Sequence, residues 1–493
     1  MTMKKKNLLA LTLGTIALAT LAGCANKATV GDAKTIQIYA WESGLGKVWL
    51  EKIIEDFNAS QTDYTATLET STDAASIIKS LDVGSSNPYD LYFTMLNSFQ
   101  HYDEFYALDD VLEFKNEGES KAIKDKFYPG YLNASKDPDD NKHHVLSYGN
   151  TIGGIVYNRS MVSDDNLPRT TDELSDLVVD LEGDGKYAWL FYNNSDNNGY
   201  WNYLSTVWAA QYSGLDYYYN TLMKLKGEDG STPSRATFEK KDGRYEAFKV
   251  MEQILTPSNT HPQCTSQNFT TVQMLYLQGA AALTVNGSWL LNENQSTADI
   301  GMMKTPVISS IIETLEDKSI KDDDTLSKVV EAIDKGETSY SGVTDKDFAR
   351  VKEARNLFYN NSAEQYVFVP KYSNCIDGSV KFLEYFYKDS SVLTYMNTLN
   401  LPSNVRLDNE SLYDGSKNAE WNKQLFKYAE YEGLMNRLDS SYVFRDHSVS
   451  CIANISTAQK LINANPKARE NADGLWSDML EKIQENWEEW SNA

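Results

Sequence analysis

Cysteine and histidine are scarce in this chain of 493 residues, which contains four cysteines and five histidines. No CxxC pair occurs, and the spacing of Cys264, Cys375 and Cys451 fits neither a zinc knuckle nor a redox motif. These three thiols allow at most one disulfide, and the sequence leaves open whether any two are bridged. His143 and His144 are adjacent, so their side chains diverge on a strand or a helix. We therefore expect no metal site and no cofactor.

Basic residues are also few, since 46 Lys and Arg face 70 Asp and Glu, a net charge of −24. Removing residues 1–23 would delete three lysines and no acidic residue, which leaves −27. A protein that binds nucleic acid neutralises phosphates with clustered Lys and Arg. The composition therefore excludes nucleic acid as a partner.

The apolar run from Leu8 to Leu21 follows three lysines and is shorter than the roughly 20 residues that span a bilayer as a helix. This layout is typical of a secretory signal peptide. The run ends in Leu21-Ala22-Gly23-Cys24, which resembles a bacterial lipobox. We expect a signal peptide over 1–23, a lipid such as palmitate on Cys24, and a small polar tether over 24–34. The protein would then be anchored on the extracellular face of the cell membrane of a Gram-positive bacterium.

From Thr35 onward, short β-rich runs alternate with amphipathic helical stretches, the pattern of βα units around a mainly parallel sheet. Strands are predicted over 36–41, 64–68 and 90–95, and helices over 47–57 and 74–83. A second series begins near Val145, where Gly149, Gly153 and Gly154 could absorb a hinge motion. The roughly 460 residues beyond the tether exceed one hydrophobic core and indicate two lobes. The charged helical stretch over 306–360 indicates no chemistry.

Residues Tyr276 to Trp289 read YLQGAAALTVNGSW. They resemble the signature of family 1 extracellular solute-binding proteins, in which an aromatic residue, a glycine and an Ala-Met pair precede Gly-x-Trp. Tyr276 replaces the usual Phe, and Leu283 replaces the usual Met. Other segments resemble the family in the same order along the chain, namely Asn87–Tyr92, Gly153–Asn158, Leu167–Leu174 with Thr171 in place of the usual Trp, Gly301–Pro306, and Val369–Pro370 followed by Lys381–Leu383.

The resemblance implies a two-lobed α/β fold of the periplasmic-binding-protein type II, with the ligand cleft between the lobes. The expected crossings lie near Asn150, Lys304 and Tyr372. The N-terminal lobe would comprise 35–150 plus 305–372, and the C-terminal lobe 151–304 plus 373–493. Such a protein captures a carbohydrate for the permease subunits of an ABC transporter and performs no chemistry. We expect a monomer that binds an oligosaccharide.

A sugar offers hydroxyl groups and weakly apolar C–H faces, so its site combines aromatic rings with hydrogen-bonding groups. Trp289 stands at a family position that stacks on sugar, and Tyr200 with Trp201 stands at another. In the first lobe, candidates follow the carboxyl ends of strands, where open α/β sheets bind ligands. The candidate ligand-binding residues are Trp289, Tyr200, Trp201, Trp41, Glu42, Thr94, Asn97, Asn150, Thr151, Asn193 and Asn194.

Two alternatives remain open at this point. The same fold could bind a non-sugar solute such as a polyamine, because Glu42 and Asp196 lie near aromatic residues. A surface glycoside hydrolase would instead need two carboxylates about 5–9 Å apart, and the same two residues could supply them. A charged trio, Arg445, Asp446 and His447, is typical of a salt-linked surface loop. With no GxSxG or HExxH motif in the chain, we expect a binding protein and not an enzyme.

Overall fold

A computed structural model gives the arrangement of most of the chain. It describes residues 34–42, 44–96, 102–128, 130–193, 200–360, 365–415, 419–431, 433–434 and 457–492, without the side chains of 489, 490 and 492. Several positions singled out above lie outside the described residues, namely Cys24, Asn97, Asn194, Asp196, Cys451 and the trio 445–447.

The first sheet has five strands in the order β2-β1-β3-β9-β4. The strands are β1 (Thr35–Trp41), β2 (Thr65–Ser71), β3 (Leu91–Met95), β4 (Leu146–Ser147) and β9 (Gln365–Phe368). β1 pairs in parallel with β2 and β3, whereas β9 is antiparallel to β3 and β4. The three strands predicted in the first hundred residues are thus confirmed. A strand from much later in the chain completes the sheet.

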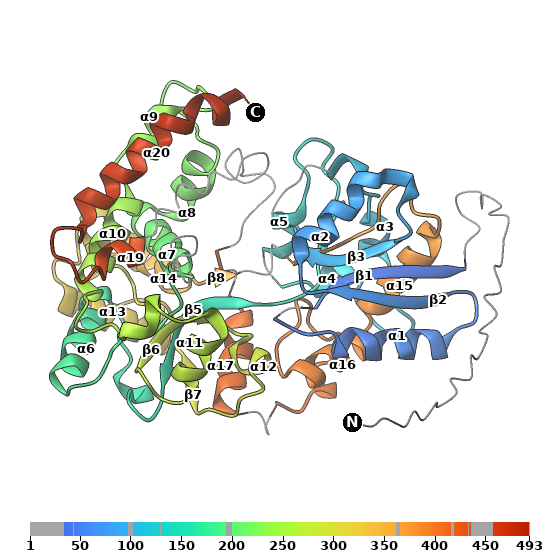
Figure 1. Cartoon of the computed structure of the whole chain (residues 1–493), viewed down its shortest axis with the longest axis horizontal. Coiled ribbons are helices and arrows are strands. Elements are labelled where there is room, and N and C mark those ends of the chain that lie inside the picture. Colours follow the sequence, from blue (N-terminus) through green and yellow to red (C-terminus); the bar gives the residue numbers. More distant parts are fainter. Residues whose placement is uncertain are drawn as a thin grey trace, which may run out of the picture.

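Helices cover both faces of this sheet (Figure 1). Helix α1 (Val48–Ser60) buries Trp49, Leu50, Ile53, Ile54 and Phe57, the apolar face expected from the sequence. The others around this sheet are α2 (Ala74–Lys79), η1 (Ser80–Ser86), η2 (Tyr102–Glu104), α3 (Asp109–Glu113), α4 (Ile123–Lys126), α5 (Tyr131–Ser135), α15 (Ile376–Phe386), α16 (Asp389–Leu399) and η8 (Glu410–Leu412). Among these, α15 and α16 pack against α1, so chain segments more than 300 residues apart share one core.

The second sheet is antiparallel, with β6 (Leu283–Gly287), β5 (Ile152–Asn158) and β7 (Ile300–Met302) in that order and β8 (Tyr359–Asn360) also paired with β5. Its helices are η3 (Asp164–Asn166), α6 (Thr171–Gly183), α7 (Trp201–Ser213), α8 (Leu215–Tyr217), η4 (Tyr218–Leu222), α9 (Arg235–Glu239), α10 (Gly243–Ile254), η5 (Pro262–Thr265), α11 (Phe269–Leu277), α12 (Leu290–Glu293), η6 (Ser309–Thr314), α13 (Asp323–Asp334), α14 (Asp345–Arg355), α17 (Glu420–Ala429), α19 (Thr457–Leu461) and α20 (Ala472–Asn492). Thr170 caps α6 by accepting a hydrogen bond from the Glu173 N–H, and the Glu173 carboxylate accepts one from the Arg169 N–H just before the cap.

The two sheets with their helices form two lobes, the first at the right of Figure 1 and the second at the left. The residues that form each lobe differ from those predicted from the sequence. After β7 the chain stays on the second sheet, since the Met303 N–H donates to the Ile155 carbonyl and Val307 bridges to Thr170. Helix α14 then packs against α7. Residues 305–360 therefore belong with the second sheet, whereas 365–412 belong with the first. The chain passes between the sheets near Asn150, as expected, but also between Asn360 and Gln365 and after Leu412, not at Lys304 or Tyr372.

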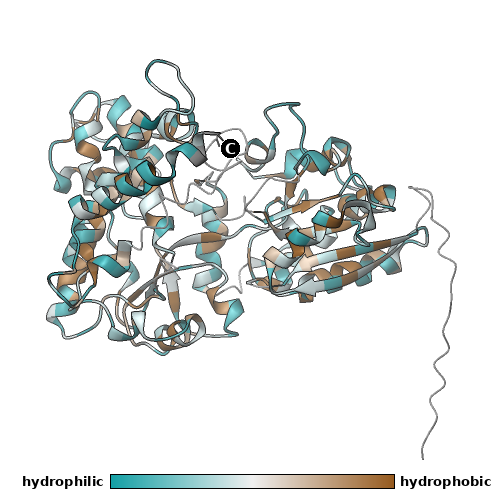
Figure 2. Ribbon diagram, turned by 45° about the horizontal axis from the view of Figure 1, so that its top comes forward, coloured by the Kyte–Doolittle hydropathy of each residue, from teal (hydrophilic) through white to brown (hydrophobic). Residues whose placement is uncertain are grey.

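Hydrophobic residues are frequent on the strands and on the inner parts of the helices, while hydrophilic residues are frequent on the outer helices and loops (Figure 2). Cys264 and Cys375 are both buried. Within the described ranges, no helix is both long enough and apolar enough to cross a bilayer.

Candidate functional site

A cavity of about 160 Å³ lies where the two lobes face each other. Residues from the first lobe, from the second lobe and from the segments that connect them all line it, so the cavity is the cleft between the lobes. Its lining consists of Trp41, Gly44, Leu45, Met95, Thr151, Tyr200, Tyr203, Trp289, Glu293 and Gln365.

Stacked aromatic rings form the wall of the second lobe. The rings of Tyr200 and Tyr203 stack with centroids 5.0 Å apart, and Tyr203 stacks in turn on Tyr359 at 4.4 Å. Trp289 meets the Tyr200 ring edge-on at a centroid distance of 5.7 Å. Offset stacks and edge-to-face pairs are the favoured arrangements of aromatic rings. The wall therefore holds its rings in place without help from a ligand.

Two glycines on neighbouring strands give these rings their space. Gly153 of β5 and Gly287 of β6 are cross-strand partners. A Cβ atom on Gly153 would lie 2.3 Å from Cδ2 of Tyr203, and one on Gly287 would lie 2.1 Å from the Trp289 ring. Gly153, considered above as part of a hinge, lies inside a regular strand, and its missing side chain makes room for a ring of the cleft wall.

Glu293 is the carboxylate of the lining. It accepts a hydrogen bond from Nε2 of Gln273 at 3.0 Å. Burial raises the pKa of Glu293 above its ordinary value, and the Gln273 hydrogen bond opposes that shift. Burial, and next the negative charge of Glu293, also raise the pKa of Tyr200, while a hydrogen bond from Trp289 lowers it. No lysine or arginine is among the described residues that line the cavity.

Gln365, at the start of β9, and Thr151, on the segment between β4 and β5, bring polar groups into the cleft. The Gln365 side chain is buried, and its Oε1 has no hydrogen-bond partner within the described residues. Buried polar atoms are normally hydrogen-bonded, to protein or to ordered water. The Gln365 amide therefore has hydrogen-bonding capacity beside the cavity that the described protein groups leave unused.

Four of the predicted ligand-binding residues line the cavity, namely Trp41, Thr151, Tyr200 and Trp289. Trp201 is instead part of the core of the second lobe, because it is fully buried edge-on to Trp189 and Phe191 at centroid distances of 5.0 and 5.2 Å. The two neighbours point apart because Tyr200 has a left-handed backbone conformation, with φ of 66°, at the start of α7.

The remaining predicted residues that the structure describes do not line the cavity. Glu42 accepts a hydrogen bond from Thr70 at 2.5 Å and lies 3.9 Å from Nζ of Lys47. Asn150 is buried and donates to the Ser403 carbonyl at 3.2 Å. Thr94 and Asn193 are buried in the first and second lobes, respectively.

The sequence reasoning missed several lining residues. Tyr203 follows Tyr200 by three positions, and Glu293 follows Trp289 by four, so helical spacing could have indicated both. Gln365 carries no such signal, because it reaches the cleft only through the late strand β9 of the first sheet.

Comparison with known proteins supports the fold assignment. No family model and no curated protein matches the chain in sequence. Among solved structures, a solute-binding protein RafE in complex with raffinose matches with 14% identity over 91% of this chain and 98% of its own, at a TM-score of 0.57. The apo form of RafE from Streptococcus pneumoniae matches with 15% identity over 92% and 98%, at 0.59. A chitin oligosaccharide binding protein matches with 14% identity over 92% and 99%, at 0.60. The predicted two-lobed α/β fold of solute-binding proteins is thus confirmed.

Proposed function

We propose that this protein is a solute-binding receptor that captures an oligosaccharide for import by an ABC transporter. The observation that carries the proposal is the cleft cavity, which has an aromatic wall on one lobe and Trp41 on the other. Solved proteins of the same fold include receptors for raffinose and for chitin oligosaccharide.

The chemistry of the lining suits a sugar. The rings of Tyr200, Tyr203 and Trp289 offer faces for the C–H surfaces of a pyranose. Gln365, Thr151 and Glu293 supply acceptors and donors for its hydroxyl groups. Because the lining comes from both lobes, closure of the lobes on the ligand would bring the two sets of contacts together.

The charge of the lining favours a neutral sugar. An anionic glycan would need Lys or Arg as partners, and the described lining contributes only the carboxylate of Glu293. The same count argues against a glycoside hydrolase, which needs a pair of carboxylates on either side of the scissile bond.

Binding to a panel of ligands tests the proposal. Isothermal titration of the purified protein against raffinose, chitin oligosaccharides and xylo-oligosaccharides should give saturable binding to at least one. Spermidine and oligogalacturonate serve as cationic and anionic comparators. Binding of spermidine alone would reassign the cleft to polyamines, and shortening of the glycans on incubation would reassign the protein to the hydrolases.

A tryptophan variant locates the binding site. We expect Trp289→Ala to weaken binding of the selected glycan at least tenfold, since stacking of the sugar on the indole is lost with the ring. Trp487→Ala, on the partly buried face of α20, is the matched control and should leave the affinity unchanged. Equal affinity of Trp289→Ala and the parent protein would remove this ring from the site.

We further propose that residues 1–23 are a signal peptide and that lipid on Cys24 anchors a monomeric receptor on the extracellular face of the membrane, beside its permease. Metabolic labelling with palmitate should tag the parent protein and not Cys24→Ala, in which the acceptor thiol is missing. A parent protein that takes up no label would contradict the lipid anchor while leaving the sugar-binding proposal intact.

A further inference from the structure

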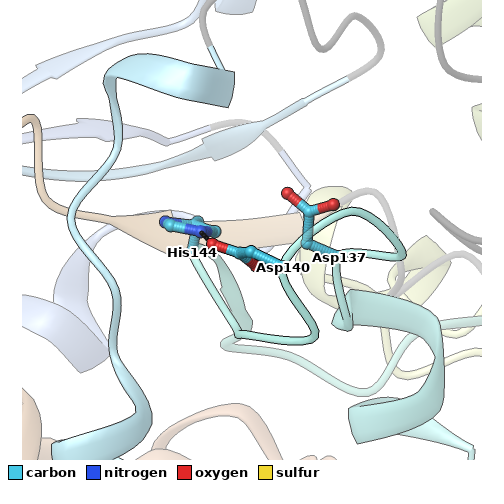
Figure 3. A group of neighbouring side chains, drawn as sticks. All are labelled: Asp137, Asp140 and His144. Atoms are coloured by element: carbon cyan, nitrogen blue, oxygen red, sulfur yellow. Dashed lines mark hydrogen bonds and ion pairs between the residues drawn. The ribbon is translucent and has the colours of Figure 1, made fainter.

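A second group of potential ligand atoms lies outside the cleft, around the turn that connects Lys136 to His143. Asp137, Asp140 and His144 each offer one ligand atom, and these atoms all lie within 4.8 Å of one another. Figure 3 shows the Asp140 carboxylate meeting the His144 ring, with Asp137 beside them on the same turn. None of the three lines the cleft cavity.

Backbone N–H groups of the turn bind one oxygen of each carboxylate. Lys136 and His143 form an antiparallel bridge, and the Asp137 N–H donates to the Lys142 carbonyl at 2.8 Å. Oδ1 of Asp137 accepts from the Asp139 N–H at 2.8 Å, and Oδ1 of Asp140 accepts from the Lys142 N–H at 2.9 Å. These are Asx-type turn contacts, and they fix the direction of each carboxylate. The second oxygen of each carboxylate takes no part in them.

The His144 ring supplies an independent reason to place a cation here. Its Nδ1 lies 2.9 Å from the carbonyl oxygen of Phe105, which can only accept, so Nδ1 carries a proton. The lone pair of Nε2 then faces Oδ2 of Asp140 at 2.9 Å. Two lone pairs at this distance repel each other unless a positive charge lies between or beside them. The side chain of His144 is 8% exposed, so bulk water screens this repulsion little.

A histidine that donates one ring N–H to a backbone carbonyl and turns the other nitrogen toward carboxylates has the arrangement of a metal ligand with its outer-shell partner. We infer that Asp137, Asp140 and His144 bind a divalent first-row transition metal ion, with Zn²⁺ as the ion that best fits one imidazole and two carboxylates. Mg²⁺ and Ca²⁺ prefer ligand sets made of oxygen alone.

Ligand atoms about 2.0–2.2 Å from Zn²⁺ are at most about 4.4 Å apart, so the group would contract slightly on binding. A water molecule would complete the coordination. This inference departs from the sequence expectation of no metal site, which rested on the divergence of His143 and His144. They do diverge, because His143 faces Asp109 and the Leu132 carbonyl. The carboxylates beside His144, those of Asp137 and Asp140, come from the turn before it.

The position suggests a structural ion. The 136–143 turn lies just before β4 and the first crossing between the lobes. Ion binding would connect this turn to the segment that carries Phe105. The site would therefore stabilise the first lobe and not contact the solute.

Metal titration of the purified, metal-depleted protein tests the inference. We expect one Zn²⁺ to bind per chain by isothermal titration, Co²⁺ to give visible d–d absorption bands, and Mg²⁺ and Ca²⁺ to compete poorly. Zn²⁺ should raise the Tm by several degrees. His144→Gln, Asp140→Asn and Asp137→Asn should each weaken Zn²⁺ binding at least tenfold.

His143→Gln is the matched control, since it changes the adjacent histidine that faces Asp109, and it should leave Zn²⁺ binding unchanged. The far-ultraviolet circular dichroism of each variant verifies that it folds. Absence of stoichiometric Zn²⁺ binding to the parent protein, with a doubly protonated His144 ring seen by NMR, would overturn the inference in favour of a bound proton. Loss of binding in His143→Gln but not in His144→Gln would overturn it as well.

Discussion

The two lobes line the cleft with different kinds of residue. The second lobe presents a stack of aromatic rings that rest on two strand glycines, Gly153 and Gly287. The first lobe presents Trp41 at the end of β1, the turn residues Gly44 and Leu45, and Met95 at the end of β3. The wall of the second lobe is already packed without a ligand, while the wall of the first lobe consists of residues at strand ends and in a turn.

The difference extends behind the walls. The first lobe is held in part by a buried ion cluster in which Nζ of Lys126 lies 2.8 Å from Glu119 and 2.7 Å from Asp389. This cluster joins α4 to the start of α16, far apart in the chain. It lies away from the cleft lining, so stability and solute binding are separable in the first lobe. In the second lobe, the same rings and glycines contribute to stability and to solute binding.

The largest effect is expected at that ion cluster. Lys126→Met removes the cation and leaves Glu119 and Asp389 facing each other, which should lower the free energy of unfolding by about 3–5 kcal/mol. Solute affinity of the folded variant should stay at the parent value. Urea unfolding and isothermal titration measure the two quantities. A large loss of affinity without loss of stability would contradict the separation of the two functions.

The pH dependence of this variant follows from Asp389. Burial alone would raise the pKa of Asp389, but hydrogen bonds from Lys126 and from the Asn409 and Asp408 N–H groups outweigh it and lower the pKa. A carboxyl group with a lowered pKa stabilises the fold above its ordinary pKa, and this contribution is lost as the pH falls through the lowered value. The difference in stability between the parent protein and Lys126→Met should therefore shrink below about pH 4.

The next effect is expected at the glycines of the second wall. Gly153→Ala would force the new methyl group into the Tyr203 ring, at a cost of about 1–3 kcal/mol in stability. We also expect at least tenfold weaker solute binding, because the stacked wall must shift. Gly154→Ala is the matched control on the same strand, since a Cβ there meets no atom within 4 Å. Equal affinities of the two variants would show that the wall adapts more freely than its packing indicates.

Much of the architecture could be predicted from the sequence. Alternation of apolar residues and helical periodicity are local signals, and they located β1, β3 and α1 to within a few residues. The lobe boundaries could not be located in this way. Whether 305–360 packs on the first or the second sheet depends on contacts such as α14 with α7, which no local pattern encodes.

The residues of the candidate site also differ in whether the sequence could indicate them. Trp289 and Tyr200 stand next to turns and carry a recognisable spacing, so the sequence could nominate them. Trp201 shows the limit of that reasoning, because adjacent residues share one sequence context and here point to opposite environments. The left-handed φ of Tyr200 separates them, and a backbone angle at a non-glycine residue cannot be anticipated from composition.

A smaller effect is expected on the first wall. Trp41 is partly exposed, and its indole N–H donates to the Thr72 carbonyl at 3.2 Å. Trp41→Ala should weaken solute binding about threefold to tenfold, since one stacking face is lost, with a change of less than about 1 kcal/mol in the free energy of unfolding. Parallel titrations of Trp41→Ala and Trp289→Ala rank the two walls. A larger loss for Trp41→Ala would place the main binding surface on the first lobe.

The smallest effect is expected at Glu293. Because burial raises its pKa, the folded protein binds this proton more tightly than the unfolded chain does. Stability then falls as the pH rises from the ordinary pKa of about 4.3 through the raised value, and Glu293→Gln removes that slope. The variant should have a Tm equal to or slightly above that of the parent at pH 7, and the difference should vanish near pH 4. Thermal unfolding across this range measures it. A Tm below that of the parent at pH 7 would mean that the ionised carboxylate, with its bond from Gln273, supports the aromatic wall and does not strain it.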